Sequence, residues 1–177
     1  MKIMCILTNG FEDIEAVGTI AILRRAGIQI DVFSLHGTDA TGRYNVHLCN
    51  LNDLHTCNTD DYGCLFIAGG PQYVELENNN YFLDIVKDFH NKNKYIAAIC
   101  AGPTILGHLG YLKNTKYTCF TSMNEDFGGD YIDKYCVADN KIITGRSAAA
   151  VIDFSFLIIE TLFGHELSDK IKKQIYY

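Results

Sequence analysis

The sequence has few basic residues, and they form no dense run. Its 15 Lys and Arg residues are outnumbered by 21 Asp and Glu residues, which gives a formal net charge of -6. Nucleic acids and anionic membrane surfaces are therefore poor candidates as partners. No apolar stretch reaches the roughly 18 residues that a membrane span needs, and no cleavage-like region follows Met1 and Lys2. We expect a soluble, cytoplasmic protein.

The cysteines lack the close spacing of a disulfide framework. There are seven, an odd number, and they are spread along the chain. This pattern favours reduced thiols in a reducing compartment. With 177 residues, of which 48% are hydrophobic, the chain can bury one good core. We expect residues 1–177 to form one domain.

Short apolar runs that indicate buried strands alternate with helical patterns. Strands are expected at Ile3–Leu7, Ile28–Leu35, Cys64–Ala68, Tyr95–Ile99 and Lys141–Thr144. Helices are expected at Glu12–Ala26, Tyr81–Asn91, Thr104–Leu109 and Ala148–Phe163, with a last amphipathic turn or two at Leu167–Ile175. Residues 36–60 and 117–137 look turn-rich, with Val46–Leu51 as a possible hairpin arm. The alternation predicts an α/β protein whose parallel sheet is covered on both faces.

Cys100 lies where a predicted buried strand breaks into a helix. Small residues at Ala98 and Gly102 allow a sharp turn there, and Pro103 suits the first turn of a helix. Free N–H groups at the start of that helix would lower the pKa of the thiol and favour the reactive thiolate. The alternative is a small buried core residue, as most cysteines are.

The loops after the other strands should meet Cys100, because sites in open α/β sheets form at the carboxyl ends of the strands. Glu12, Asp13 and Glu15 follow the first strand within about one helical turn. Glu12 and Asp13 are expected to reach water and complement the helix dipole. Glu15 is expected to face partly inward, although it too could serve only the dipole.

Two further loops carry candidate binding groups. Gly69 and Gly70 could bring backbone N–H groups close to a ligand, as an oxyanion hole requires, or form a plain tight turn. The only two prolines, Pro71 and Pro103, each directly follow a glycine in one of these loops. Arg146 could clamp an anion or be an exposed, solvated arginine.

The sequence contains two His–Cys pairs that resemble possible metal ligands. His47 and Cys49, and likewise His55 and Cys57, are two residues apart and could share strand faces. Their spacing matches no common structural zinc motif. We expect no metal site, and ordinary hairpin and core residues instead.

Together, five stretches closely resemble the DJ-1/ThiJ/PfpI superfamily, in order from Lys2 to about Ile171. They are Phe11–Ala16, Leu23–Gly27, Asp61–Pro71, Ala97–Pro103 and Ile142–Arg146. The resemblance implies a flavodoxin-like, glutamine-amidotransferase-like three-layer sandwich with a mostly parallel central sheet, commonly a homodimer. It also implies an oxidation-prone nucleophile at Cys100 that is hydrogen-bonded by protonated Glu15, with N–H groups of Gly70 and Ala101 as the oxyanion site. Arg146 and Arg43 would bind anions near the dimer interface.

Two departures from the superfamily narrow the functional prediction. Ala101 stands where protease-like members carry a histidine, which places the chain in the DJ-1/ThiJ branch. Phe120 stands near the position of another histidine of some members, so acid-base chemistry would fall to Glu15. We expect a cofactor-free, cysteine-dependent glyoxalase or deglycase that acts on small dicarbonyls or their adducts. The alternative is a non-enzymatic redox sensor or redox-regulated chaperone that uses Cys100.

Overall fold

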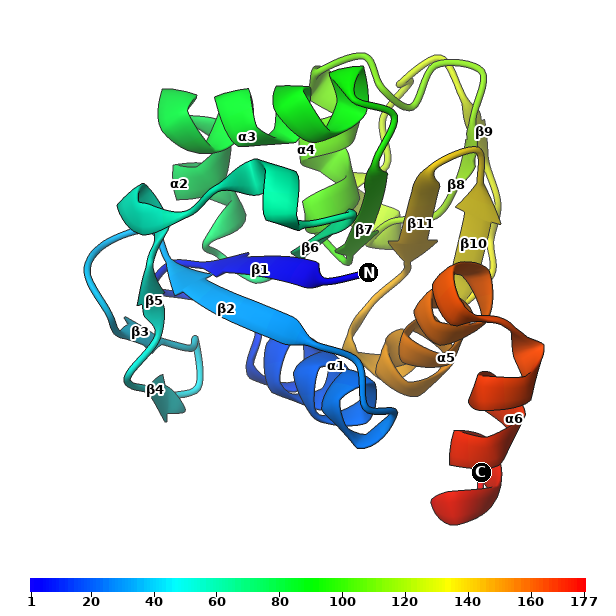
Figure 1. The fold of residues 1–177 in the computed structure, drawn as a ribbon. Helices are drawn as coiled ribbons and strands as arrows, with labels where there is room; N and C mark the ends of the chain where they lie inside the picture. Colours follow the sequence, from blue (N-terminus) through cyan, green and yellow to red (C-terminus); the bar gives the residue numbers. More distant parts are fainter.

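A seven-stranded sheet runs through the centre of the computed structural model, which describes residues 1–177 (Figure 1). Its strand order is β10-β11-β7-β6-β1-β2-β5, and only the β10–β11 pair is antiparallel. The central order β2-β1-β6-β7-β11 is the flavodoxin-like order 2-1-3-4-5. The strands are β1 (Ile3–Leu7), β2 (Ile30–Ser34), β5 (Asn52–Asp53), β6 (Cys64–Ile67), β7 (Tyr95–Ile99), β10 (Cys136–Asp139) and β11 (Ile142–Gly145). The predicted mostly parallel α/β architecture is confirmed.

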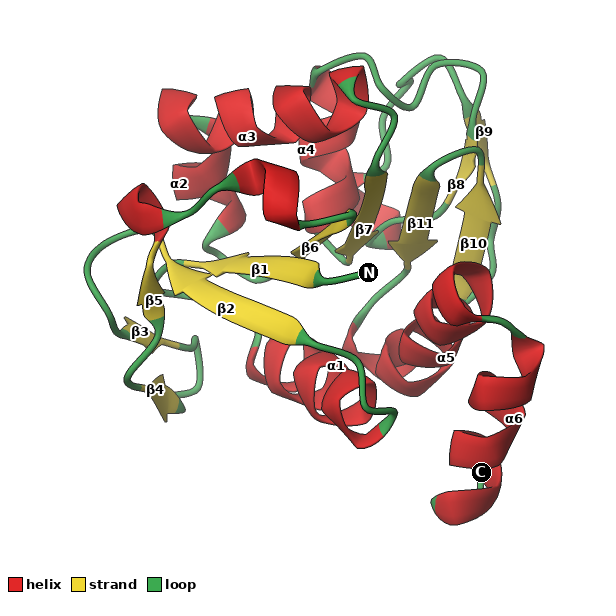
Figure 2. Ribbon diagram, in the orientation of Figure 1, coloured by secondary structure: helices red, strands yellow, loops and turns green.

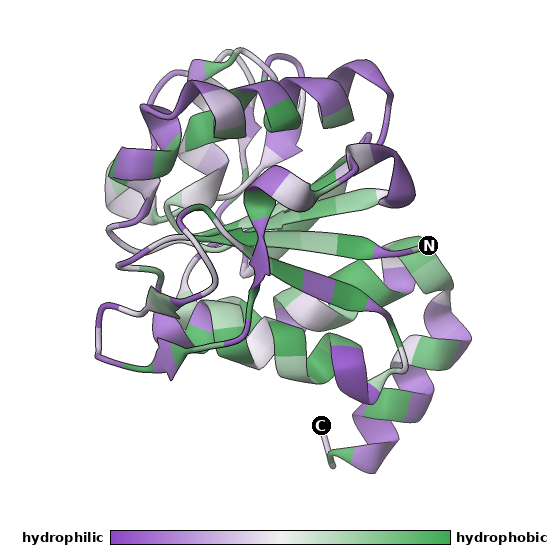
Figure 3. Ribbon diagram, turned by 60° about the vertical axis from the view of Figure 1, so that its left-hand side comes forward, coloured by the Kyte–Doolittle hydropathy of each residue, from purple (hydrophilic) through white to green (hydrophobic).

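Helices cover both faces of the sheet (Figure 2). Helices α1 (Asp13–Arg25) and α5 (Val151–Phe163) lie on one face, and α2 (Tyr73–Glu77), α3 (Asn80–Asn91) and α4 (Gly102–His108) lie on the other. Two core clusters of 23 and 22 buried residues occupy the two faces. This even division explains why the central strands are continuously hydrophobic (Figure 3). No helix in the structure has the length and apolarity that crossing a bilayer requires.

The ends of helix α1 follow from its sequence. The Glu12 side chain caps the helix by accepting a hydrogen bond from the Glu15 N–H at 2.8 Å. Gly27 follows the last turn with φ at +76°, a conformation that glycine adopts without steric cost. At the other end of the chain, α6 (His165–Gln174) packs against α5.

The regions expected to be irregular contain short elements. Strands β3 (Ala40–Thr41) and β4 (His47–Leu48) form an antiparallel pair, so the possible hairpin arm is confirmed in part. Strands β8 (Lys116–Tyr117) and β9 (Asp130–Tyr131) form a separate parallel pair. Single 3-10 turns occur at Leu54–Thr56, Thr59–Asp61, Thr121–Met123 and Ala148–Ala150. The edge strands β5 and β10 and helix α2 were not predicted, because none of them carries a hydrophobic period long enough to identify.

Backbone hydrogen bonds tie together the loops at the carboxyl ends of the strands. The Glu12 N–H donates to the Gly69 carbonyl at 3.0 Å, and the Gln72 N–H donates to the Gly10 carbonyl at 3.1 Å. On the other side of β6, the Cys100 N–H donates to the Gly145 carbonyl at 2.9 Å. The loops after β1, β6, β7 and β11 therefore converge, as the parallel arrangement predicts.

Candidate active site

Cys100 sits on a strained turn between β7 and α4. Its φ is +62°, in the left-handed region that non-glycine residues rarely adopt. The turn is held by the hydrogen bond to Gly145 and by the Phe120 N–H, which donates to the Cys100 carbonyl at 2.8 Å. A Cβ at Gly102 would lie 2.9 Å from the Ile67 carbonyl oxygen, so the small residue is required there. The sharp turn expected from the sequence is present.

Glu15 reaches the turn from the first part of α1 and is fully buried. Its Oε2 accepts a hydrogen bond from the Gly69 N–H at 2.9 Å, whereas its Oε1 is buried without a partner. The carboxyl interacts with the Cys100 thiol. Burial raises the pKa of Glu15 from 4.5 to about 7. Glu15 thus faces inward completely, and much of it is protonated at neutral pH.

The pKa of Cys100 differs from the sequence-based expectation. Burial and the neighbouring Glu15 carboxylate raise the thiol pKa, while the N–H groups of Ala101 and Gly70 act in the opposite direction. The expectation of a lowered pKa considered the N–H groups and the helix but not the burial, which is the largest cause of the shift, and the expectation is wrong. Protonation of Glu15 removes that charge, so the thiol and the carboxyl titrate as a pair.

Glu12 and Asp13 do not reach water, contrary to the expectation. Both are buried, with 7% and 6% of their surface exposed. Glu12 caps α1, as described above. The Asp13 carboxylate accepts hydrogen bonds from the N–H groups of Tyr44 and Val46 at 3.0 and 3.1 Å. Asp13 therefore fixes the loop between β3 and β4 beside the start of α1.

Gly69 and Gly70 are packed too tightly to be replaced by larger residues. A Cβ at Gly69 would lie 2.7 Å from both the Cys100 Cβ and the Glu15 Oε2. Gly70 has φ at +86°, and a Cβ there would lie 2.4 Å from the Glu12 nitrogen. This close approach lets Gly70, together with Ala101, direct an N–H group toward the sulfur.

A pocket of about 440 Å³ opens above the thiol. Its polar and titratable lining consists of Glu12, Glu15, Arg43, Ser147 and Cys100. The remaining lining is mostly apolar or aromatic and comprises Tyr44, Gly70, Pro71, Tyr73, Val74, Ala101, Phe120, Met123, Ala148 and Ala149. The structure therefore brings Cys100, Glu15, Gly70, Ala101 and Arg43 to one cavity, with Gly69 directly behind it.

The two candidate arginines lie in different surroundings. Arg43 lines the pocket, with its guanidinium carbon 5.0 Å from the centre of the Tyr44 ring. Arg146 does not line the pocket. It forms an ion pair of 2.6 Å with Asp133 and lies 4.8 Å from the centre of the Tyr135 ring. The structure places Arg43 within reach of a ligand at Cys100 and leaves Arg146 engaged elsewhere.

Comparison with known proteins agrees with this geometry. The sequence profile of the DJ-1/PfpI family matches residues 1–161. The chain belongs to the DJ-1/PfpI family. It is 30% identical to the Parkinson disease protein 7 homolog of Danio rerio, over 97% of this chain and 94% of that protein. It is 27% identical to the deglycase PfpI of Pyrococcus furiosus, over 82% and 90%. The crystal structure of Drosophila melanogaster DJ-1beta superimposes with a TM-score of 0.91 at 26% identity, covering 99% and 98% of the two chains.

Within this DJ-1/PfpI fold, Gln72 is a supporting residue that the sequence analysis missed. It is buried, its Oε1 accepts a hydrogen bond from the Thr8 N–H at 2.9 Å, and its Nε2 donates to the Ala68 carbonyl at 2.8 Å. These bonds connect the loops after β1 and β6. Nothing in the sequence analysis indicated this residue, because it lies in a loop whose partners are distant in the sequence.

The His and Cys pairs after β3 do not form a site in the structure. No group of three or more His, Cys, Asp or Glu side chains is arranged to hold a metal ion. His47 Nδ1 lies 3.0 Å from the Thr41 hydroxyl, and the His55 ring stacks on Tyr81 with 4.8 Å between centroids. These histidines make ordinary local contacts.

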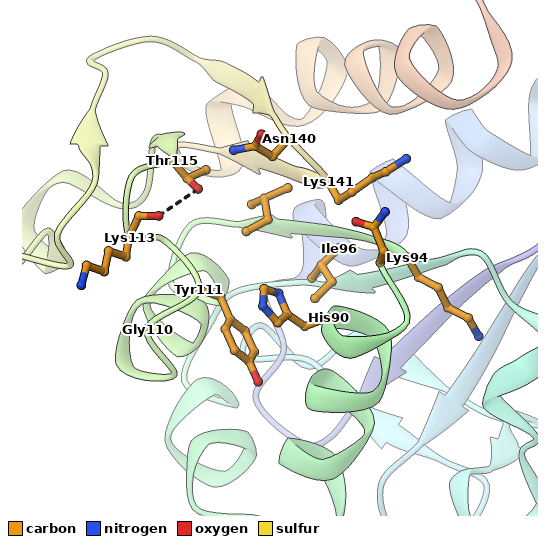
Figure 4. Close-up of a pocket in the computed structure, with 11 residues that line it drawn as sticks. His90, Lys94, Ile96, Gly110, Tyr111, Lys113, Thr115, Asn140 and Lys141 are labelled. Carbon is orange, nitrogen blue, oxygen red and sulfur yellow. Dashed lines mark hydrogen bonds between the residues drawn. The ribbon is translucent and has the colours of Figure 1, made fainter.

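A second pocket, of about 420 Å³, lies at the opposite end of the sheet (Figure 4). It surrounds the amino ends of β7 and β11 and contains no Cys, Asp or Glu. The rings of His90 and Tyr111 stack there with 3.6 Å between centroids. In Figure 4 the ammonium group of Lys113 points to one side, and those of Lys94 and Lys141 point to the other. Nothing in this pocket can serve as a nucleophile comparable to Cys100.

Proposed function

We propose that the protein is a cysteine-dependent enzyme that converts methylglyoxal-type dicarbonyls, or their adducts with amines and thiols, into hydroxy acids without a cofactor. The observation that carries this proposal is the arrangement around Cys100. A thiol on a strained turn faces two backbone N–H donors and a buried carboxyl with one unpaired oxygen. The same three parts are what the reaction needs, namely a nucleophile, an oxyanion site and a group that moves protons.

The reaction begins with attack of the Cys100 sulfur on the aldehyde carbon. A carbon–sulfur bond forms, the S–H bond breaks, and the thiol proton moves to the carbonyl oxygen, whose developing charge the N–H groups of Gly70 and Ala101 stabilise on the way to the hemithioacetal. Glu15, in its carboxylate form, then removes the proton from this carbon and returns it to the neighbouring carbon, while the hydroxyl proton moves to the neighbouring oxygen. The adduct thereby becomes a thioester of the hydroxy acid. Water hydrolyses the thioester and restores the thiol.

Glu15 suits this role for two reasons. Its pKa of about 7 lets it accept and release a proton near neutral pH. Its Oε2 is fixed by the Gly69 N–H, so Oε1 is the oxygen that is free to carry the proton. Phe120, which lines the pocket, has no proton to transfer.

The name of one relative supports the proposal, since the Pyrococcus furiosus protein is a deglycase. A redox sensor is the second candidate, and the unpaired Glu15 Oε1 favours it as well. A protonated carboxyl could donate a hydrogen bond to an oxygen of a Cys100 sulfinate and halt oxidation at that stage. Turnover of a dicarbonyl distinguishes the two candidates.

Lactate formation from methylglyoxal by the purified protein tests the proposal. We expect steady-state production by the wild type and by Cys49→Ala, which removes an exposed thiol that does not line the pocket. Cys100→Ala should reduce production to the uncatalysed background. Wild-type production equal to that of Cys100→Ala would refute the enzyme and leave the sensor.

We also propose that the chain acts as a homodimer in a reducing compartment such as the cytoplasm. All seven cysteines are free thiols. An apolar groove between α1 and α5 contains the exposed side chains of Ile14 and Ile152, and it shares Ala148 and Ala149 with the Cys100 pocket. Covering this groove with a second copy would remove apolar surface from water. Sedimentation at micromolar concentration should show a dimer, and a monomer would contradict this assembly.

A further inference from the structure

The apolar wall of the Cys100 pocket is larger than a methyl group requires. Methylglyoxal would place only a methyl group in a cavity of about 440 Å³. Three aromatic rings, those of Tyr44, Tyr73 and Phe120, line this cavity with Val74 and Met123. A cavity of this size and character matches ligands larger than a three-carbon aldehyde.

The backbone of two of these aromatic residues is tied to the residues that supply the reacting groups. The Phe120 N–H donates to the Cys100 carbonyl at 2.8 Å, and the Tyr73 N–H donates to the Gly70 carbonyl at 3.1 Å. The backbone of Phe120 is therefore tied to the residue that carries the sulfur, and that of Tyr73 to a residue that supplies an oxyanion N–H. Both rings line the cavity that a substituent of a bound carbonyl compound would enter.

The same two rings have no aromatic partner inside the protein. Phe120 is 43% exposed, and neither Phe120 nor Tyr73 makes a ring–ring or cation–ring contact. Other partly exposed rings are paired, such as Tyr81 with His55 and Tyr135 with Arg146. An exposed ring at a pocket wall gains by covering its apolar face, and a flat ring covers it best.

We infer that Phe120 and Tyr73 form an aromatic subsite beside Cys100, which makes arylglyoxals better substrates than methylglyoxal. This inference rests on the proposed function for its substrate class, whereas the subsite itself rests on the two rings and their backbone anchors. Differences of substituent size in an apolar pocket change kcat/KM by about 10- to 200-fold. We therefore expect phenylglyoxal to exceed methylglyoxal in kcat/KM, measured from initial rates, by at least about tenfold.

Alkylation tests the subsite independently of turnover. N-benzyl iodoacetamide and iodoacetamide both form a sulfur–carbon bond with a thiolate and release iodide, and they differ in the aromatic group. The exposed Cys49 in the same molecule corrects for their intrinsic reactivity. Mass mapping at limiting reagent gives the ratio of Cys100 to Cys49 labelling for each reagent. We expect the benzyl reagent to raise this ratio by about tenfold over iodoacetamide.

Variants assign the effect to the rings. Phe120→Ser should remove most of the preference for the benzyl reagent and for phenylglyoxal, and Phe120→Tyr should retain it. Tyr176→Ala, which removes a ring that is 99% exposed and lies outside the pocket, is the matched control and should change neither. Retained thermal unfolding temperatures would show that the variants fold.

The alkylation ratio tests the aromatic subsite, and the turnover of the two glyoxals tests the proposed enzyme activity. Equal labelling ratios for both reagents in the wild type would overturn the subsite, as would a preference that Phe120→Ser leaves intact. A benzyl preference without turnover of either glyoxal would support the subsite and refute the proposed function. Turnover of methylglyoxal at a rate equal to or above that of phenylglyoxal would overturn the inferred substrate preference and leave the enzyme standing.

Discussion

Two pockets of similar volume lie at opposite ends of the central sheet, and they are lined by different kinds of residue. The pocket at the carboxyl ends of the strands, of about 440 Å³, contains a thiol, a buried carboxyl and tightly packed glycines. The pocket at the amino ends, of about 420 Å³, contains lysines, asparagines and a His90–Tyr111 stack. A cavity alone therefore does not identify an active site in this fold.

The difference lies in how the backbone and the titratable groups are held. At the carboxyl ends, Cys100 has a positive φ, and Gly70 has a backbone nitrogen 2.4 Å from where its Cβ would be. At the amino ends, Gly110 also has a positive φ, but nothing lies within 4 Å of its Cβ position. Close packing at the carboxyl ends buries Glu15 beside Cys100 and shifts the pKa of both. Perturbed titratable groups held by such packing are typical of functional sites.

Substitutions in the two pockets should differ most in their effect on turnover. Glu15→Gln should lower kcat/KM for methylglyoxal by about 10²- to 10⁴-fold, because an amide cannot carry the proton between the two carbons. His90→Gln in the amino-end pocket should change it by less than about twofold, since His90 only stacks on Tyr111. Steady-state lactate assays measure both. Full activity in Glu15→Gln would break the assignment of the carboxyl-end pocket as the active site.

The next effect concerns stability and pH. Folded Glu15 keeps its proton up to about pH 7, whereas in the unfolded chain the carboxyl releases it near pH 4.5. Stability should therefore fall as pH rises from about 4.5 to 7, by about 3 kcal/mol from this group. Urea unfolding of wild type and Glu15→Gln across this range isolates the contribution, because the variant lacks the titration. Parallel pH profiles for the two proteins would show that Glu15 is not buried as described.

A pair of glycine substitutions compares the packing of the two ends directly. Gly70→Ala and Gly110→Ala both place a Cβ on a residue with positive φ, at +86° and +79°. The backbone cost of about 1–2 kcal/mol is therefore shared. Gly70→Ala should lose about 2 kcal/mol more, because its Cβ would clash with backbone atoms of Gly10, Phe11 and Glu12. Equal midpoints of chemical denaturation for the two variants would contradict the difference in packing.

The smallest effects on stability and turnover are expected from Arg146, which lies outside the pocket. Arg146→Ala removes an ion pair with Asp133, whose side chain is 74% exposed, so it should change the free energy of unfolding by less than about 1 kcal/mol. It should leave methylglyoxal turnover within about twofold, because Arg146 does not line the pocket. Arg43→Ala, which alters the pocket lining, should have the larger effect on KM. A larger effect on KM from Arg146→Ala than from Arg43→Ala would support the anion-binding role of Arg146 that the family resemblance implies. Sedimentation of the variant would then show whether Arg146 acts through the dimer.

Sequence patterns were sufficient for the parts of the fold that local rules determine. Continuous apolar runs identified the five central strands, and helical patterns identified α1, α3, α4 and α5 to within a few residues. The turn at Cys100 was predictable because small residues and a proline surround it. The two-residue strand β5, the edge strand β10 and helix α2 were not, because each is too short to show a hydrophobic period, and β5 in addition pairs with a strand distant in the sequence.

The residue types by themselves determined which groups could do chemistry, and tertiary structure decided what state those groups are in. The sequence identified Cys100, Glu15 and the glycine pair as candidates, but it predicted a lowered thiol pKa and solvent-exposed carboxylates at Glu12 and Asp13. Burial reversed both, because the free energy of a charge depends on how much water its surroundings exclude. Water is excluded here because loops that follow four different strands pack together. No single stretch of the sequence contains all four loops.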